Sequence, residues 1–405
     1  MKYDFTSIID RHGLDSIAVD PDAGSVYRKD ITLREGIVGH IPMWVADMNF
    51  ATCPTIPEAM TRRLLHPTYG YFTLRGEYYD GILCWHEKRN GVKDLKKEHI
   101  GYENGVLGAM ATAMHAFCSQ GDAVLLHSPT YIGFTSVIEN NGYRAVHSAL
   151  QRDENDVWRM DYADMEEKIV KHKIHFAVFC SPHNPTGRVW KKEEIEQAME
   201  IFRRHDVIVF SDEIWSDILL FGNKHIPTQS VSEDARDRTI ALYAPSKTFN
   251  LAGLVGSYHI IYNKYLKDRM DKEASLGHYN SPNLASMYAQ IGAYTEEGHA
   301  WIDELNQVLS DNVSYALDHI AGHYPGVRVS RPEGTYMLYL DCADYLRKTG
   351  ITIDELLRRG YEAGVDWQDG RPFFLEDSIR MNLALPLSRV QEAFRRLDRY
   401  VFEIT

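Results

Sequence analysis

Short apolar runs recur along the first three quarters of the chain. They are rich in β-branched and aromatic residues, which favour strands, and helical patterns such as 105–119 and 191–205 separate several of them. The runs are AVLLH (123–127), HFAVFC (175–180), VIVFS (207–211), TIALY (239–243) and VGSYHIIY (255–262). Continuously apolar strands that alternate with helices are typical of a mainly parallel sheet covered on both faces. We therefore predict a three-layer α/β domain over residues 46–290.

The pattern of the chain changes after residue 290. A long amphipathic stretch comes first, and strand-like and helix-like segments follow it, so that the patterned segments are 299–320, 334–341, 352–363, 378–385 and the region from 388 onward. This mixture predicts a smaller α+β domain formed by residues 291–405 together with the N-terminal segment 1–45. In open α/β sheets, ligands bind beyond the carboxyl ends of the strands, so the candidate chemistry is sought there.

Length and composition agree with a two-domain globular protein. The chain has 405 residues, of which 44% are hydrophobic and 25% charged. The formal net charge of −13 argues against nucleic acid or an anionic membrane as a partner. The first ten residues, MKYDFTSIID, do not resemble a targeting signal, and no apolar run approaches the length of a membrane span. We expect a cytoplasmic protein.

Cysteine and histidine spacing predicts neither disulfides nor a metal site. The five cysteines are odd in number and scattered, without a C-x-x-C pair, and the eighteen histidines form no H-E-x-x-H motif. We expect reduced, mostly buried thiols and no bound metal.

A lysine follows one of the buried strands. Lys247 lies in LYAPSKTFNL (242–251), after an apolar run and a Pro-Ser pair. A lysine at the end of a buried strand is either a salt-bridged structural residue or a desolvated amine that serves as a nucleophile. The segment alone favours the structural role, and its neighbours in the predicted sheet decide between the two.

Two further strand ends carry polar residues. Asn184 lies in the rigid turn FCSPHNPTGRVW (179–190), and Asp212 follows buried residues in VFSDEIWSDI (209–218). Each residue alone is compatible with an ordinary turn or a helix cap. Because the carboxyl ends of parallel strands meet at one edge of a sheet, the amide, the carboxylate and the Lys247 amine are expected to converge.

Pyridoxal phosphate chemistry needs such a trio. A lysine binds the cofactor covalently, a carboxylate keeps the pyridinium nitrogen protonated, and a donor holds the phenolic oxygen. The dianionic phosphate suits a helix N-terminus, which Gly105 at the start of the 105–119 pattern offers. Tyr131 in SPTYIGF is placed either to stack on the ring or to pack as a half-buried aromatic residue.

A series of motifs runs nearly end to end through the chain. In order, they are MWVADMNF, YGYFTLRGEYYDGILCWHEKRNGV, SPHNPTGRVW, SDEIWSDI, APSKTFNLAGL, EGTYMLYLD and IRMNLALP. With these motifs, the chain resembles a fold-type I pyridoxal phosphate enzyme of the class I/II aminotransferase superfamily. Within it, the sequence is most similar to the MalY/PatB-type cystathionine β-lyases, including the cystalysin-like C-S lyases. The combination is far more specific than any single motif.

The resemblance implies a role for each matching residue. Lys247 would be the Schiff-base lysine and the acid/base, Asp212 the partner of the pyridinium nitrogen, and Asn184 a donor to the phenolic oxygen. The other implied roles are ring stacking by Tyr131, phosphate binding by the amides of Val106 and Leu107 with the Ser246 hydroxyl, a contact of Tyr71 with the neighbouring subunit's site, a grip on the substrate carboxylate by Arg380, and a substrate-side wall at Ala46. The implied assembly is a homodimer with shared active sites.

Four positions depart from the family pattern. Trp215 stands where aminotransferases usually carry tyrosine and the lyases often histidine; its indole N–H is also a donor, so we keep it among the cofactor-binding residues. Val255 stands where many aminotransferases place a phosphate-binding arginine, which resembles the lyase branch. Ala244 replaces a serine that often helps to bind phosphate, and Ile132 replaces the second tyrosine of cystalysin.

The function implied by the resemblance is α,β-elimination of a cysteine S-conjugate such as cystathionine to pyruvate, ammonia and a thiol. A class I/II aminotransferase is the rival interpretation, because the fold and most cofactor residues are shared. Two further alternatives are a lyase that also restrains a transcription activator by binding it, and a cofactor-free binding module on the same fold. The predicted partner is a small-molecule amino-acid substrate, with no nucleic acid or membrane partner.

Overall fold

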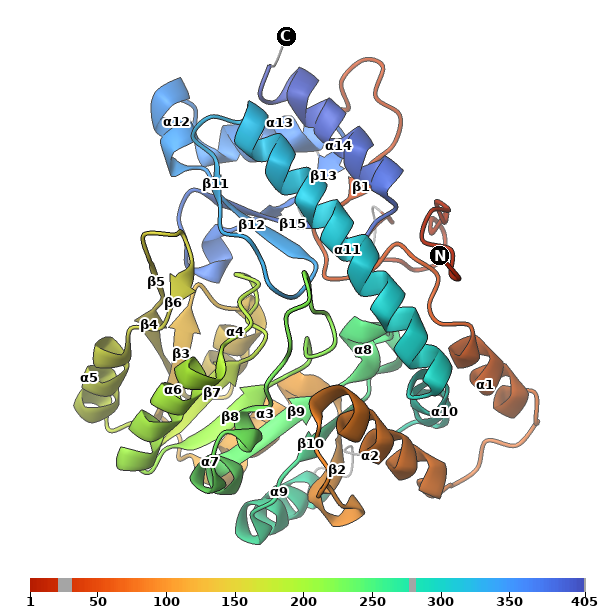
Figure 1. The fold of residues 1–405 in the computed structure, drawn as a ribbon, viewed down its shortest axis with the longest axis vertical. Helices are drawn as coiled ribbons and strands as arrows, with labels where there is room; N and C mark the ends of the chain where they lie inside the picture. The colour runs from red at the N-terminus through yellow and green to blue at the C-terminus, as the bar shows by residue number, and fades with distance from the viewer. Residues whose placement is uncertain (21–30, 277–281, 404–405) are drawn as a thin grey trace.

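The computed structural model describes residues 1–20, 31–276 and 282–403, and a seven-stranded sheet is its largest element (Figure 1). In spatial order, the strands are β2 (Ile100–Glu103), β10 (Ser257–Ile260), β9 (Thr239–Tyr243), β8 (Ile208–Asp212), β7 (Phe176–Cys180), β3 (Ala123–Ser128) and β4 (Arg144–Ala149). Neighbouring strands from β9 to β4 pair in parallel, whereas β10 pairs antiparallel with both β9 and β2. The prediction of a mainly parallel sheet is confirmed.

Helices cover both faces of this sheet because successive strand residues point to opposite sides. Leu125 and Phe179 pack on one face and Leu126 and Phe210 on the other, each pair within its own apolar cluster. The helices in the first cluster are α5 (Tyr162–His172), α6 (Lys192–Arg204) and α7 (Glu233–Arg238); those in the second are α3 (Gly105–Phe117), α4 (Ile132–Asn140) and α9 (Lys264–Leu276). The fold is therefore the predicted three-layer α/β sandwich.

Further helices, a small hairpin and several 3₁₀ turns lie outside the C-terminal sheet and its helices. They are the helices α1 (Thr55–Leu64), α2 (Gly76–Asn90), α8 (Pro245–Thr248) and α10 (Leu284–Ala293), the hairpin β5 (Gln151–Arg152) and β6 (Trp158–Arg159), and 3₁₀ turns at Lys97–His99, Thr228–Ser230, Ala252–Leu254 and Arg371–Phe373. α8 and the turn after it follow β9 directly, which places the lysine segment at the carboxyl end of the sheet.

The C-terminal part of the chain forms a second sheet, drawn in blue at the top of Figure 1. Its antiparallel strands lie in the order β11 (Arg328–Val329), β12 (Met337–Asp341), β15 (Ser378–Asn382) and β14 (Gln368–Asp369). The helices of this part are α11 (Glu296–His323), α12 (Ala343–Thr349), α13 (Ile353–Glu362) and α14 (Leu387–Tyr400). One apolar cluster joins this sheet to its helices through residues such as Leu309, Leu338, Leu356 and Phe394. The expected smaller α+β unit is therefore present.

The N-terminal segment joins this C-terminal part. β1 (Ile41–Pro42) pairs in parallel with β13 (Val365–Asp366), and the Arg34 amide donates to the carbonyl of Glu362 at 2.9 Å. The domain boundaries at residues 45/46 and 290/291 stay predictions.

Most predicted elements agree with the structure within a few residues. The pattern at 299–320 lies inside α11, and the patterns at 105–119 and 191–205 correspond to α3 and α6. The run 255–262 is strand only over Ser257–Ile260, because Val255 has a φ of 40° and belongs to a turn. Over the described ranges, no helix is both long and apolar enough to cross a membrane. The cytoplasmic location stays a prediction.

Candidate active site

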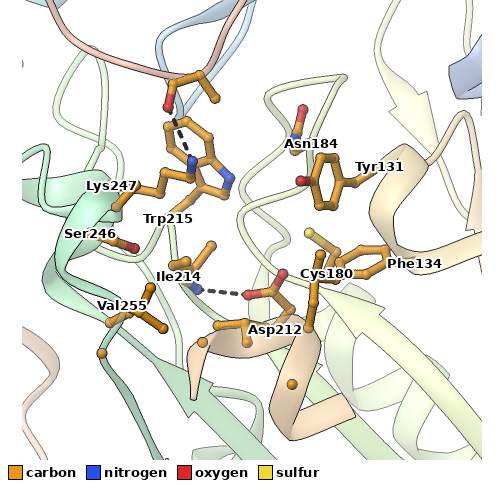
Figure 2. Close-up of a pocket in the computed structure, with 18 of the residues that line it drawn as sticks. Tyr131, Phe134, Cys180, Asn184, Asp212, Ile214, Trp215, Ser246, Lys247 and Val255 are labelled. Carbon is orange, nitrogen blue, oxygen red and sulfur yellow. Dashed lines mark hydrogen bonds between the residues drawn. The ribbon is translucent and has the colours of Figure 1, made fainter. Parts of the chain in front are cut away.

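The residues after three neighbouring strands surround one cavity. Asn184 follows β7, Asp212 ends β8, and Lys247 follows β9, so the parallel pairing brings all three to the same sheet edge. The cavity has a volume of about 240 Å³, and Figure 2 shows these side chains around it. Every predicted site residue except Tyr71 and Arg380 lines it: Ala46, Val106, Leu107, Tyr131, Asn184, Asp212, Trp215, Ser246 and Lys247.

Lys247 lies in the short helix α8, which Pro245 begins, as suits a first helical position. Its Nζ donates a hydrogen bond to the Ala46 carbonyl at 3.1 Å and lies 5.7 Å from the Trp215 ring centre. Burial lowers the pKa of this amine to about 8, and the Arg380 cation acts in the same direction. About a tenth of the amine is therefore neutral at a pH of about 7, far more than in an ordinary lysine, and the neutral form is the one that a nucleophile or base requires.

Asp212 is buried on another wall of the cavity, with 5% of its surface exposed. Its Oδ1 accepts a hydrogen bond from the Ile214 amide at 3.0 Å, drawn in Figure 2. Burial raises the pKa of Asp212 to about 7. A cationic partner inside the cavity would restore the charged carboxylate, because an opposite charge favours the ionised form.

Glu213 points to the other side of the chain from Asp212. It is fully buried, and its carboxylate accepts hydrogen bonds from the Ser211 hydroxyl, the Thr228 amide, the Tyr243 hydroxyl and His225. Burial alone would raise the pKa of Glu213, but His225 and the hydrogen bonds outweigh burial and the pKa ends below its usual value. This buried carboxylate anchors the end of β8 and so fixes the direction of Asp212.

Arg380 of β15 lies beside the cavity and contacts Asn184. Its Nη1 donates to the Asn184 Oδ1 at 3.1 Å, and its Nη2 donates to the Trp44 carbonyl and to Gln368. The guanidinium also lies 4.4 Å from the Phe373 ring centre. The small sheet thus contributes to the site at the large sheet.

The charge of Arg380 has no acidic counterpart among the described residues. The side chain is buried, its hydrogen-bond acceptors are neutral, and its Nε has no partner in the described part of the chain. Burial lowers the pKa of Arg380 to about 10, so the group is still a cation at neutral pH. A buried cation with neutral acceptors and a free N–H is suited to an incoming carboxylate.

The N-terminus of α3 forms the third part of the cavity wall. Gly105 has a φ of 76°, a conformation that favours glycine, and the first turn of α3 contains no acidic side chain. The cavity is lined there by Val106, Leu107 and Gly108, and Ser246 faces it from α8. Free helix N–H groups, the helix dipole and a hydroxyl suit a dianion such as phosphate.

These groups fit pyridoxal phosphate. The cavity offers an amine with a lowered pKa, a buried carboxyl whose ionised form a cationic ring nitrogen would stabilise, and a helix N-terminus for phosphate. Tyr131 lines the same cavity at the start of α4. A Cβ atom on Gly133 would lie 2.5 Å from the Tyr131 ring, so this glycine permits the observed ring position.

Of the four positions that depart from the family pattern, three line the cavity and one does not. Trp215 is buried and lines the cavity, as do Val255 and Ala244. Val255 presents an aliphatic side chain at the wall where many aminotransferases place an arginine, so that cation is absent from this position. Ile132 begins α4 and does not line the cavity.

Tyr71 lies away from the cavity of its own chain. It is fully exposed and borders a surface hollow with Tyr69, Phe72, Leu74 and Pro282. Its predicted contact with a neighbouring subunit, like the other residue roles, stays a prediction.

Sequence reasoning missed the residues that hold the site residues in place. Gln368 and Trp44 contact Arg380, and Glu213 anchors Asp212, but no spacing rule links these positions. SDEIW did contain one available signal, since a second acid directly after a buried strand needs buried partners.

A second group of polar side chains lies at the opposite edge of the sheet. Ligand atoms of Cys118, Asp122 and His175 lie within 4.8 Å of one another, next to the amino ends of β3 and β7. The cysteine spacing had given no sign of this group. Burial raises the pKa of the Cys118 thiol to about 12, so the thiol is protonated at neutral pH and is a poor metal ligand.

Comparisons with known proteins agree with this geometry. The chain is 32% identical to cystathionine beta-lyase PatB of Bacillus subtilis, over 89% of this chain and 92% of that protein. It is 30% identical to protein MalY of Escherichia coli, over 96% of both chains. Among solved structures, cystalysin from Treponema denticola, which contains pyridoxal 5'-phosphate, matches with a TM-score of 0.90 and 28% identity over all of both chains.

A pyridoxal-phosphate-bound C-S lyase from Staphylococcus hominis matches with a TM-score of 0.89 and 30% identity, over 99% of this chain and 98% of that one. The family model for aminotransferase class I and II matches residues 47–397, which is most of the chain. The chain therefore belongs to the class I and II aminotransferase family.

Proposed function

We propose that this protein is a pyridoxal-phosphate-dependent carbon–sulfur β-lyase that acts on cystathionine or related cysteine S-conjugates. The observation that carries the proposal is that Lys247, Asp212 and the N-terminus of α3 face one cavity. The lyase names of PatB and of the Staphylococcus hominis structure, together with the likeness to cystalysin, support the reaction type. The family alone does not distinguish lyase from aminotransferase.

The cofactor would be held by the groups already described. Lys247 would bind it covalently, Asp212 would face the ring nitrogen, Asn184 and Trp215 would lie on the phenolic side, and Tyr131 would stack on the ring. The amides of Val106 and Leu107, with Ser246, would hold the phosphate. When bound, pyridoxal phosphate supplies a ring that stabilises negative charge at the substrate Cα.

The chain's own residues then orient the substrate and move its protons. Arg380 binds the α-carboxylate, and Asn184 and Gln368 hold its guanidinium in position. Lys247 takes the Cα proton, a task suited to an amine whose pKa is about 8. Asp212, charged beside a cation, keeps a proton on the ring nitrogen.

The overall reaction balances with one water molecule. The Cα–H and Cβ–S bonds break, and the sulfur leaves as a thiol that carries one proton. Hydrolysis of the remaining three-carbon fragment gives pyruvate and ammonia. Neither an oxidant nor a second amino acid is needed.

The lyase reaction is favoured over amino transfer by the relatives and by one position in the wall. Val255 occupies the place where many aminotransferases carry an arginine, and PatB is named a cystathionine beta-lyase. A pyridoxal-phosphate-bound structure from Clostridium difficile, 33% identical to this chain, is named a putative aminotransferase. Amino transfer is therefore the other outcome to be tested.

We include a homodimer in the proposal. Tyr71, Tyr69 and Phe72 form an exposed aromatic group around a surface hollow, and such groups mark protein interfaces. In the dimer, Tyr71 would reach the partner's cavity.

Borohydride reduction of the native protein tests the covalent link. Peptide mapping should place a pyridoxyl group on Lys247 in the wild-type chain. The Lys247→Ala variant should lack the label and lose turnover, whereas Lys264→Ala, at a highly exposed lysine, should keep both. A label elsewhere, or activity in Lys247→Ala, contradicts the assignment.

Product analysis tests the reaction. Purified holoenzyme is given L-cystathionine or an S-alkyl cysteine, and pyruvate and thiol are measured together. Equal amounts of the two products support the lyase. Amino transfer that depends on an added oxo acid, without thiol release, supports the aminotransferase instead.

A further inference from the structure

The segment that carries Asp212 also carries a third acid, which lies outside the cavity lining. Asp217 is buried, with 4% of its surface exposed, between α2, α8 and α11. Its Oδ1 accepts a hydrogen bond from the Trp85 indole at 3.1 Å, and Arg89 Nε lies 3.5 Å from the same oxygen. Its Oδ2 accepts a hydrogen bond from the Thr248 hydroxyl at 2.9 Å.

Trp85 and Arg89 are one helical turn apart on α2 and so face the same side of that helix. Arg89 also pairs with Asp303 of α11 at 2.7 Å. The backbone carbonyl of Asp217 accepts a further hydrogen bond from Asn306 of α11 at 2.9 Å. Asp217 is therefore held from two long helices, and its own position is rigid.

The hydrogen bond from the Thr248 hydroxyl connects Asp217 to the segment that carries Lys247. Thr248 directly follows Lys247 in α8, and its side chain is fully buried. A four-residue helix is too short to be stable by itself, so outside contacts must fix it. Because a threonine side chain is stiff about χ1, a bond at its hydroxyl also fixes the backbone next to it.

Few polar contacts hold the Lys247 side chain itself. Within the described residues, the hydrogen bond of Nζ is the one to the Ala46 carbonyl, and a covalently bound cofactor would replace it. The direction of the long side chain then depends on the backbone of α8. Small displacements of a reacting group cost large factors in rate.

We propose that Asp217 is a positioning residue that holds the Lys247 turn through the Thr248 hydroxyl. This inference rests on the proposed role of Lys247 as the residue that binds the cofactor. Asp217 and Thr248 do not line the cavity, so neither touches substrate or cofactor.

The test uses an isosteric pair of variants in the holoenzyme. Thr248→Val removes the hydroxyl and keeps the shape, whereas Thr248→Ser keeps the hydroxyl. We expect Thr248→Val to lower kcat by about tenfold to a hundredfold with little change in KM, and to change the visible circular dichroism of the bound cofactor. Thr248→Ser should restore most of both signals, and Asp217→Ala, which removes the carboxylate acceptor of the Thr248 hydroxyl, should resemble Thr248→Val.

Thr239→Val is the matched control. Thr239 is fully buried in β9, and its hydroxyl has no partner in the described part of the chain. This variant should keep the wild-type kcat and dichroism, and its Tm measures what the loss of a buried hydroxyl does to stability alone. If Thr248→Val lowers only Tm, or if Thr248→Ser is as impaired as Thr248→Val, the inference is overturned.

The dichroism signal separates this inference from the proposed reaction, since it is recorded without substrate. A wild-type protein that shows the expected pattern among variants but cleaves no C–S bond overturns the lyase function and supports the role of Asp217. If the wild-type protein cleaves the substrate but the variants keep the wild-type kcat and dichroism, the lyase function is supported and the role of Asp217 is overturned.

Discussion

Arg380 and Asn184 are joined by a 3.1 Å hydrogen bond between the guanidinium Nη1 and the amide Oδ1. Arg380 belongs to β15 of the small sheet, and Asn184 follows β7 of the large sheet. The contact therefore links the proposed substrate anchor to the proposed cofactor site. A charge introduced at position 184 would therefore lie within hydrogen-bond distance of the Arg380 guanidinium.

Asn184→Asp should raise KM for the amino-acid substrate by about tenfold or more. The new carboxylate would neutralise Arg380 and compete with the α-carboxylate of the substrate. Steady-state kinetics on protein with full cofactor absorbance measures the effect. A wild-type KM in this variant would show that the Arg380 charge is not used for substrate binding.

Arg380→Lys should lower kcat/KM by about a hundredfold, because an ammonium group lacks the planar fork with which guanidinium donates to both oxygens of a carboxylate at once. Arg396→Lys is the control, since this buried arginine pairs with Glu392 and backbone carbonyls and does not line the cavity. The control tests whether loss of a buried guanidinium harms the enzyme in general. Equal losses in both variants would contradict a specific role of Arg380.

Reconstitution of the apoenzyme should depend on the ionisation of Lys247. The amine must be neutral to react, and burial lowers its pKa to about 8. The rate of covalent cofactor capture should therefore rise about tenfold per pH unit below that value and level off above it. Stopped-flow absorbance over a pH range from about 6 to about 9.5 measures the profile. A rate that still rises steeply at the alkaline end would indicate a lysine with an ordinary pKa.

Asp212→Asn should stabilise the apoenzyme at alkaline pH. The folded-state pKa of Asp212, about 7, lies above the usual value of 3.8, so the wild-type chain loses stability as the pH rises from the lower value through the higher one. Asparagine does not titrate, and it keeps an oxygen for the Ile214 amide. Urea unfolding should give a gain on the order of 4 kcal/mol at a pH of about 8. The gain should shrink by more than half at a pH of about 5, and a gain independent of pH would contradict this explanation.

Gly133→Ala should weaken cofactor binding by about tenfold while the protein still folds. The new Cβ would lie 2.5 Å from the Tyr131 ring and 2.9 Å from the Leu107 side chain, so the ring must shift. Gly322→Ala in α11 is the control, because its Cβ meets open space. Equilibrium titration of the two apoenzymes with pyridoxal phosphate compares them. Equal affinities would show that the Tyr131 ring position does not matter for binding.

The layers of the large domain could be predicted well because its strands are buried on both faces. Runs such as 176–180 are apolar throughout, and their ends are marked by Pro, Gly and polar residues. β2 and β4 were not predicted. Arg144–Ala149 is an edge strand with exposed and half-buried positions, so the apolar signal is weak there.

Residues at the ends of parallel strands could be predicted to meet, because topology alone brings them together. The positions of Asn184, Asp212 and Lys247 follow from this rule. Arg380 enters the site from a different sheet, and only the family resemblance pointed to it. The partners of Glu213 and Asp217 could not be predicted, since buried polar contacts between distant segments leave no periodic signal in one sequence.

The opposite directions of Asp212 and Glu213 limit how this part of the chain can change during evolution. One carboxyl faces the cavity and its neighbour faces the buried His225, because consecutive residues of an extended chain alternate. Deleting a single residue within β8 would turn Glu213 toward the cavity, whereas inserting one would turn Asp212 toward His225. The segment is therefore expected to tolerate replacement of its apolar residues among related proteins, but not a change in length.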